Sequence, residues 1–238
     1  MRPIPAAALG VLMAGLVAGP AAAHSLKELE ADIAGREKYF QALGQGREAP
    51  AFALQEADGR TVRLADLRGK VVVLNFIYAS CPDLCPLHSE RIAELQKMVN
   101  QAKMEDRVEF VSITTDPEHD TAAVMKAYGG QHGLDPANWL FLTSGPTRPD
   151  ETRELARHYG QEFTKGADGI ETHGVVTHII DRDGLWRAKL YGLKFDQLSA
   201  LTYINALVND VHSAEPQEKP SLVQRIERFF SSALGTSG

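Results

Sequence analysis

Cysteine is scarce in this sequence, which has only two cysteines among 238 residues. Two are too few for the disulfide framework of a small secreted protein, so the pair is better suited to chemistry than to holding the chain together. Basic residues are also in deficit, with 25 Lys and Arg against 31 Asp and Glu and a net charge of −6. No basic stripe is present, which argues against nucleic acid as a partner. Internal repeats are lacking too, and the length suits one domain with extensions.

The N-terminus has the pattern of a secretory signal. Arg2 precedes an apolar run over residues 6–17, and a small-residue cleavage site follows at residues 21–23. We therefore predict that residues 1–23 are a signal peptide and that the protein is exported to the periplasm. The alternative is an uncleaved anchor in the inner membrane, because the apolar run approaches the length that spans a bilayer.

Amphipathic segments flank the body of the chain. Apolar residues recur at near-helical spacing over residues 25–43, which predicts an amphipathic helix in residues 24–45 and a break at residues 44–50. This helix would pack on its own domain or on a partner. Residues 213–220 read as a polar linker, and an apolar stripe over residues 222–234 predicts a C-terminal helix. That helix could contact a membrane surface or a partner, or pack on its own domain, and these interpretations stay open.

Alternating strands and helices predict an α/β domain over residues 46–212. An Asp-Gly turn at residues 58–59 indicates an N-terminal hairpin, and the turn at residues 182–184 indicates a second one near the end. Between them, a β-α-β-α core is followed by an inserted strand and helix, and a β-β-α unit completes the order of a thioredoxin-like fold. The predicted strands are residues 52–55, 61–64, 71–78, 108–114, 139–143, 174–181 and 185–191, and the predicted helices are residues 87–104, 121–128, 149–159 and 196–211.

The cysteine pair lies at the first junction between a core strand and a helix. Cys81 and Cys85 follow the strongly apolar residues 71–78 and are four residues apart, so they can lie about one helical turn apart on one face. That spacing allows a shared metal ion or a disulfide. A helix N-terminus favours thiolate over thiol, and soft thiolates select copper(I), zinc or iron–sulfur clusters.

A mononuclear copper(II) site needs at least one more ligand than two sulfurs, and three histidines are candidates. His88 follows Cys85 by three residues and could face the same way, His173 precedes a predicted strand, and His178 lies within that strand. In a thioredoxin-like arrangement the loop at His173 lies beside the cysteine junction, so His173 could complete a Cys2His site. Asp83 could orient a ligand or cap the helix.

Several segments together resemble the Sco/SenC family of copper proteins, over residues 46–212. The resemblance rests on the Cys-Pro-x-x-Cys-Pro motif at residues 81–86, on residues 113–121 and 139–143, and on His173 placed eight residues before Asp181. It implies that Cys81, Cys85 and His173 bind copper, as copper(I) or copper(II), and that the protein assists assembly of the copper A centre of cytochrome c oxidase. Where family members often have Asp before the ligand histidine, this sequence has Thr172, so His88 and His178 stay as alternatives.

Two functions remain to be distinguished. The first is a metallochaperone, not an enzyme, that delivers copper to the copper-bearing oxidase subunit or exchanges it with other copper chaperones. The second is a thiol–disulfide oxidoreductase that reduces the cysteines of its target before metal insertion. Oxidoreductases of this fold mostly use a Cys-x-x-Cys motif after an aromatic residue, whereas here the spacing is one residue longer and Ser80 precedes Cys81. A peroxidase is weaker still, because the Thr-x-x-Cys context is lacking.

Overall fold

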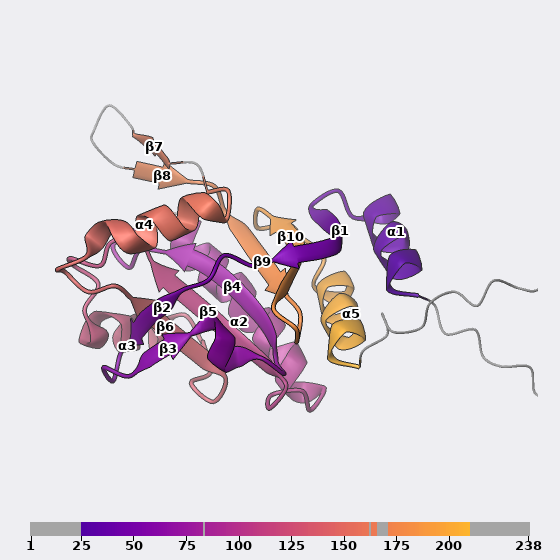
Figure 1. The fold of residues 1–238 in the computed structure, drawn as a ribbon, viewed down its shortest axis with the longest axis horizontal. Helices are drawn as coiled ribbons and strands as arrows, with labels where there is room; N and C mark the ends of the chain where they lie inside the picture. Colours follow the sequence, from indigo (N-terminus) through magenta and orange to yellow (C-terminus); the bar gives the residue numbers. More distant parts are fainter. Residues whose placement is uncertain (1–24, 83, 162, 166–170, 210–238) are drawn as a thin grey trace, which may run out of the picture.

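Three apolar segments form the parallel centre of an eight-stranded sheet. The computed structural model describes residues 25–82, 84–161, 163–165 and 171–209. The three segments are β4 (Val71–Ile77), β5 (Val108–Thr114) and β6 (Trp139–Thr143). β4 and β5 are buried along their whole length, as expected for strands covered on both faces. The strand order is β1-β10-β9-β4-β5-β6-β2-β3 (Figure 1).

Five further strands pair antiparallel and extend this sheet on both sides, and β7 and β8 form a separate two-stranded sheet. The other elements in chain order are α1 (Leu26–Arg36), β1 (Phe40–Glu48), β2 (Ala53–Glu56), β3 (Thr61–Arg63), a 3-10 turn (Leu64–Leu67), α2 (Leu84–Gln101), α3 (Ala122–Gln131), α4 (Pro149–His158), β7 (Phe163–Lys165), β8 (Glu171–His173), β9 (Val176–Ile180), β10 (Leu185–Tyr191) and α5 (Gln197–Val208). The two hairpins predicted from turn residues are confirmed as β2–β3 and β9–β10. The thioredoxin-like order is also confirmed.

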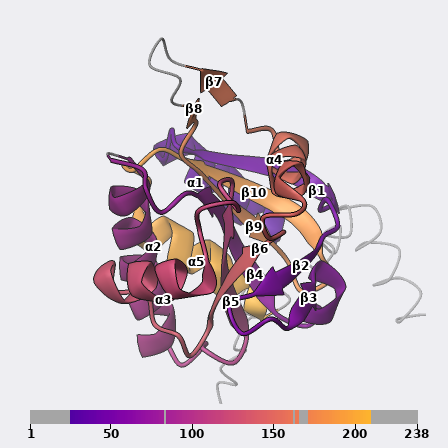
Figure 2. The same cartoon turned by 90° about the vertical axis from the view of Figure 1, so that its left-hand side faces the viewer.

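Helices cover both faces of the sheet (Figure 2). We call the side covered by α1, α2, α3 and α5 the α2 face, and the side covered by α4 the α4 face. Side chains of β4 alternate between them: Val71 and Val73 pack in the core under α2 and α5, whereas Val72, Leu74 and Phe76 pack in the core under α4. This period-two alternation gives the domain two apolar cores separated by the sheet.

The N-terminal segment differs from the sequence prediction. The predicted helix over residues 25–43 ends at Arg36, and Phe40–Glu48 forms β1, which pairs antiparallel with β10. The Phe40 ring packs edge-on against Tyr203 of α5, with 5.0 Å between ring centroids. The predicted domain boundary at residue 46 therefore falls within a strand. α1 packs on its own domain, because Ile33 is fully buried in the core under α2 and α5.

Other boundaries also differ. α3 continues through Gly129 and Gly130 to Gln131, past the predicted end at residue 128. The small hairpin β7–β8, which projects beyond the main sheet (Figures 1 and 2), was not predicted. Within the described residues, none of the helices is long and apolar enough to span a bilayer. The predicted signal at residues 1–23 and the C-terminal linker and helix at residues 213–238 lie outside the described residues.

Candidate metal centre

The two cysteines lie where β4 leaves the sheet and α2 begins. Residues 78–81 form a turn in which the Cys81 amide donates to the Tyr78 carbonyl at 3.2 Å. Cys85 lies in the first turn of α2, and its backbone N–H donates to the Cys81 Sγ at 3.3 Å. Neither cysteine is part of a disulfide; Cys81 is half-buried and Cys85 is buried. The prediction that the pair lies together at a loop-to-helix junction is therefore confirmed.

The environment of Cys85 differs from the one expected at a helix N-terminus. The neighbouring Cys81 sulfur and burial both raise the pKa of the Cys85 thiol far above its ordinary value, and a backbone contact with Tyr78 opposes them only in part. Both causes disfavour the Cys85 thiolate, because the uncharged thiol can share its proton with Cys81 and loses less solvation on burial. A metal ion that binds both sulfurs as thiolates must therefore displace a proton from the pair.

One side of the pair is an apolar wall. Cys85 packs with Ile77, Met125, Tyr128 and Phe141, and the Tyr128 hydroxyl is 2.8 Å from the buried Ser89 hydroxyl. On the outer side, the start of α2 is open: the Leu84 and Leu87 side chains are 44% and 51% exposed. A metal ion bound to the two sulfurs would thus be shielded from water by the apolar cluster around Cys85, and it could be approached from solvent past the exposed start of α2.

The backbone of His173 lies at the same end of the sheet as the cysteine turn. His173 is the last residue of β8 and pairs with Phe163 of β7. β9 begins three residues later and runs antiparallel to β4, with Thr177 opposite Asn75. The start of β9 therefore lies beside the end of β4 from which the chain passes to Cys81. This agrees with the predicted position of the loop, and the assignment of His173 as a ligand stays a prediction.

The two alternative histidines are engaged elsewhere. His88 is buried between α2 and the sheet, where its Nε2 is 2.8 Å from the Thr177 hydroxyl. His178 points to the α4 face, among the rings of Phe76, Tyr159 and Trp186. Burial holds the pKa of His178 well below its usual value, so it is neutral. In the part of the chain that the structure describes, no three His, Cys, Asp or Glu side chains form a metal-binding group.

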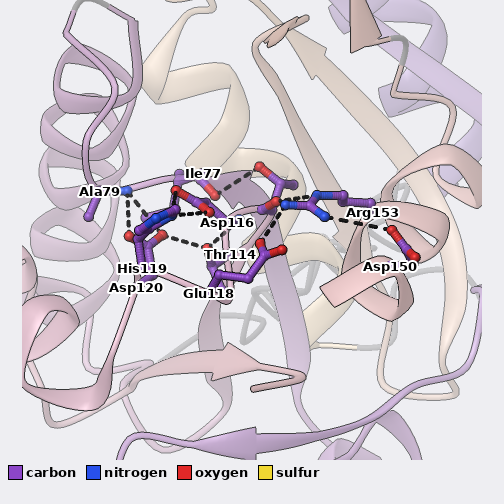
Figure 3. A network of polar contacts seen from close by, with 10 residues as sticks. Ile77, Ala79, Thr114, Asp116, Glu118, His119, Asp120, Asp150 and Arg153 are labelled. Atoms are coloured by element: carbon purple, nitrogen blue, oxygen red, sulfur yellow. Dashed lines mark hydrogen bonds and ion pairs between the residues drawn. The ribbon is translucent and has the colours of Figure 1, made fainter. Parts of the chain in front are cut away.

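The structure adds a residue that the sequence reasoning missed. Asp120 follows β5, and its side chain is buried against the cysteine turn (Figure 3). Its carboxylate accepts hydrogen bonds from the Ala79 N–H at 3.1 and 3.3 Å and from the Thr114 hydroxyl at 2.5 Å. Burial raises the pKa of Asp120, while these two hydrogen bonds act in the opposite direction. The only sequence signal was its place in the segment over residues 113–121 that carries the family resemblance.

Comparisons with known proteins agree on one family. The family model described as SCO1/SenC matches residues 41–209. A SCO1 protein homolog from Bacillus subtilis is 32% identical over 139 residues, which cover 58% of this chain and 70% of the relative. The structure resembles a SCO1/SenC family lipoprotein from Bacillus anthracis, with a TM-score of 0.63, 25% identity, and coverage of 70% of this chain and 97% of the other. It also resembles copper-bound ScoI from Bradyrhizobium japonicum, with a TM-score of 0.55, 28% identity, and coverage of 68% and 99%.

Proposed function

Because the chain belongs to the SCO1/SenC family, we propose that it carries one copper ion on Cys81, Cys85 and His173 and delivers it to the copper A centre of cytochrome c oxidase. Sco proteins are a family of cytochrome c oxidase assembly proteins, and copper binding follows from the copper-bound relatives. The proposal adds two points to family membership and copper binding: the three residues that bind the copper, and its delivery to the oxidase. In this role the protein is a metal carrier rather than an enzyme.

One observation carries the proposal: the two cysteines, which are not joined by a disulfide, meet at the first turn of α2. The Cys85 N–H contact to the Cys81 Sγ holds the sulfur of the turn against the helix that carries the second sulfur. Two soft thiolates with an imidazole suit both copper(I) and copper(II). The topology supports His173 as the third donor, since the start of β9 lies beside the end of β4. His178, which points to the opposite face of the sheet among aromatic rings, is disfavoured as a ligand.

The oxidoreductase is the second candidate, and the unequal burial of the sulfurs favours it. Cys81 is half-buried whereas Cys85 is buried, as in a pair with an attacking and a resolving thiol. The Cys81 thiolate would attack a disulfide of the target and release one target thiolate, and Cys85 would then attack the mixed disulfide and release the second. The chain would end as a Cys81–Cys85 disulfide and would need an external dithiol to restore it.

The test is metal analysis of the reduced protein together with absorption spectroscopy. We expect about one copper per chain and a sulfur-to-copper charge-transfer band. His173→Ala should lower copper(II) affinity while the dithiol still cycles with a redox buffer. The matched control is His119→Ala, because His119 is 79% exposed and makes its hydrogen bonds to Asp116 rather than to the cysteines. An unchanged stoichiometry and spectrum in His173→Ala would refute the third-ligand assignment.

The cellular role has its own test. Cells with the Cys81→Ser/Cys85→Ser double variant should fail to assemble active oxidase under either candidate function, and normal assembly would refute both. Under the metal-carrier proposal, His173→Ala should fail as well, whereas a pure oxidoreductase would keep its activity. The proposed recipient is the copper-bearing oxidase subunit, with exchange from other copper chaperones.

The proposed location is the periplasm. The signal pattern at residues 1–23 supports export, and the Bacillus anthracis relative is described as a lipoprotein. The proposed C-terminal helix over residues 222–234 would add contact with a membrane surface. Fractionation of cells, with and without residues 213–238, would test both points: full-length protein in the cytoplasmic fraction would contradict export, and an unchanged membrane fraction after truncation would contradict the surface contact.

A further inference from the structure

A buried carboxylate connects the cysteine turn to the neighbouring loop of the sheet. Asp120 is 2% exposed, and its two oxygens face the Ala79 N–H and the Thr114 hydroxyl (Figure 3). Ala79 lies two residues before Cys81, inside the turn that is closed by the Cys81-to-Tyr78 hydrogen bond. The carboxylate therefore holds the backbone from which the Cys81 sulfur projects.

Pairing between β4 and β5 continues past the ends of these strands through this contact. The Thr115 N–H donates to the Ile77 carbonyl at 2.8 Å, which extends the parallel register in which Ile77 lies opposite Thr114. Asp120 then makes the next connection, to Ala79. The exit of β4, including the turn that leads to Cys81, is thus fixed to the exit of β5 by backbone and side-chain hydrogen bonds in succession.

Asp120 is itself held in place by its own loop. The Thr114 hydroxyl accepts from the Asp116 N–H at 2.9 Å while it donates to Asp120, and the Asp120 N–H donates to the Asp116 carbonyl at 3.0 Å. From α4, Arg153 donates to the Thr115 carbonyl at 3.0 Å and to the Glu118 carboxylate at 2.6 Å (Figure 3). The loop is therefore anchored on its other side to the helix of the α4 face, which makes Asp120 a rigid support.

We propose that Asp120 is a positioning residue for copper binding: it fixes the turn at Ala79 and thereby sets where the Cys81 sulfur lies relative to Cys85. The inference deepens the proposed function and rests on it for the copper ligand set. Residues that orient metal ligands from behind typically change metal affinity by about 10- to 100-fold when they are lost. The role requires the acceptor geometry of the side chain and not its charge.

The experiment compares Asp120→Ala and Asp120→Asn in the full chain. Alanine removes both acceptors, so the Ala79 amide should exchange with deuterium about tenfold faster in the copper-free protein, as expected for the loss of one hydrogen bond. Copper(II) affinity should fall by about tenfold or more, with a shifted charge-transfer band. Asparagine keeps an acceptor for the Ala79 N–H and can donate to the Thr114 oxygen, so it should stay close to wild type in both measurements.

Asp181→Ala is the matched control. Asp181 is also 2% exposed and accepts from two backbone amides, those of Asp183 at 3.0 Å and Leu185 at 2.9 Å. It lies at the opposite end of the sheet, because Ile180 is paired with Val72 near the start of β4. Its loss should lower stability and leave copper affinity unchanged. Should Asp120→Ala fail to fold, Thr114→Val removes one donor to the carboxylate and should change both measurements in the same direction by a smaller amount.

Three outcomes would overturn the inference. The first is wild-type copper affinity and wild-type Ala79 exchange in Asp120→Ala. The second is loss of copper affinity in Asp120→Asn while Ala79 stays protected, which would assign the effect to charge. The third is an equal loss of affinity in Asp181→Ala, which would assign it to general destabilisation.

Failure of the proposed function is distinguishable from failure of this inference. A wild-type protein that binds no copper would refute the copper carrier. Amide exchange at Ala79 and the rate of Cys81 alkylation by iodoacetamide, both measured without copper, would still show whether Asp120 positions the turn. Unchanged rates in Asp120→Ala would then refute the inference alone.

Discussion

Two adjacent glycines in α3 have opposite surroundings, and this leads to a sharp prediction. A Cβ atom at Gly129 would lie 2.0 Å from Cζ3 and 2.3 Å from Cη2 of Trp139, whereas a Cβ at Gly130 would have nothing within 4 Å. Trp139 packs against the core under α2 and α5 and against the cluster that contains Cys85. Alanine at Gly129 must therefore displace the indole, and alanine at Gly130 need not move anything.

The magnitudes follow from these contacts. Overpacking a core site costs about 1–3 kcal/mol, and displacement of Trp139 also weakens its 3.1 Å hydrogen bond to the Ser112 hydroxyl, worth about 1 kcal/mol. The higher helix propensity of alanine offsets about 1 kcal/mol. Gly129→Ala should thus lower the free energy of unfolding by about 1–3 kcal/mol. Gly130→Ala should raise it by up to about 1 kcal/mol, because only the propensity acts there.

Urea unfolding followed by far-UV circular dichroism measures both changes. Tryptophan fluorescence, measured in a Trp186→Phe background so that it reports on Trp139, serves as a separate readout, and it should shift in the folded state of Gly129→Ala alone. The reasoning is refuted if the two variants change stability in the same direction, or if Gly129→Ala is as stable as wild type with an unchanged emission maximum. Either result would mean that α3 or the indole ring moves without cost.

Two further predictions concern acid. Burial lowers the pKa of His178, so the unfolded chain takes up a proton below about pH 6.5 that the fold does not, and stability should fall as pH drops, by up to about 1.4 kcal/mol per unit. His178→Phe should lack this part of the slope in urea titrations between about pH 7 and pH 5.5, and identical slopes would contradict the assignment. Asp196 accepts from the Ser199 N–H at 2.7 Å as the cap of α5, and hydrogen bonding to Ser199 lowers its pKa. Asp196→Ala should cost about 1 kcal/mol at pH 7. The difference from wild type should shrink as pH falls below about 3.9, where the unfolded carboxylate begins to take up a proton, and should vanish once the folded carboxylate, with its lower pKa, is protonated too; a difference that stays constant in acid would count against this.

Local patterns were sufficient for the centre of the fold. β5, β6 and β10 have the predicted bounds, and β4 differs by one residue, because a strand buried on both faces is a short continuous apolar run. The two hairpins were predictable from residues 58–59 and 182–184, since their turn chemistry is local.

The errors arose where contacts distant in sequence decide the structure. Gly44 and Gly46 read as helix breakers, but β1 continues through them because its partner is β10, about 140 residues later. Likewise, Gly129 does not end α3, since its missing side chain makes room for Trp139. A single sequence contains the residues of such contacts but not their pairing.

At the candidate site, spacing predicted the meeting of Cys81 and Cys85, and strand order predicted the end of the sheet at which His173 lies. Spacing did not predict that Asp120 is buried, because an Asp after a strand is usually a solvated loop residue. It also did not predict the raised pKa of the Cys85 thiol, which depends on how closely the other sulfur approaches.

The outermost strands have a consequence for how this molecule meets other proteins. β3 is only three residues long, and β1 loses its register between Ala42 and Arg47, where Gly44 and Gly46 adopt positive φ angles of 67° and 79°. Intermolecular strand addition needs a straight row of free amides and carbonyls, which neither border offers. The sheet is thereby protected against edge-to-edge aggregation at both borders.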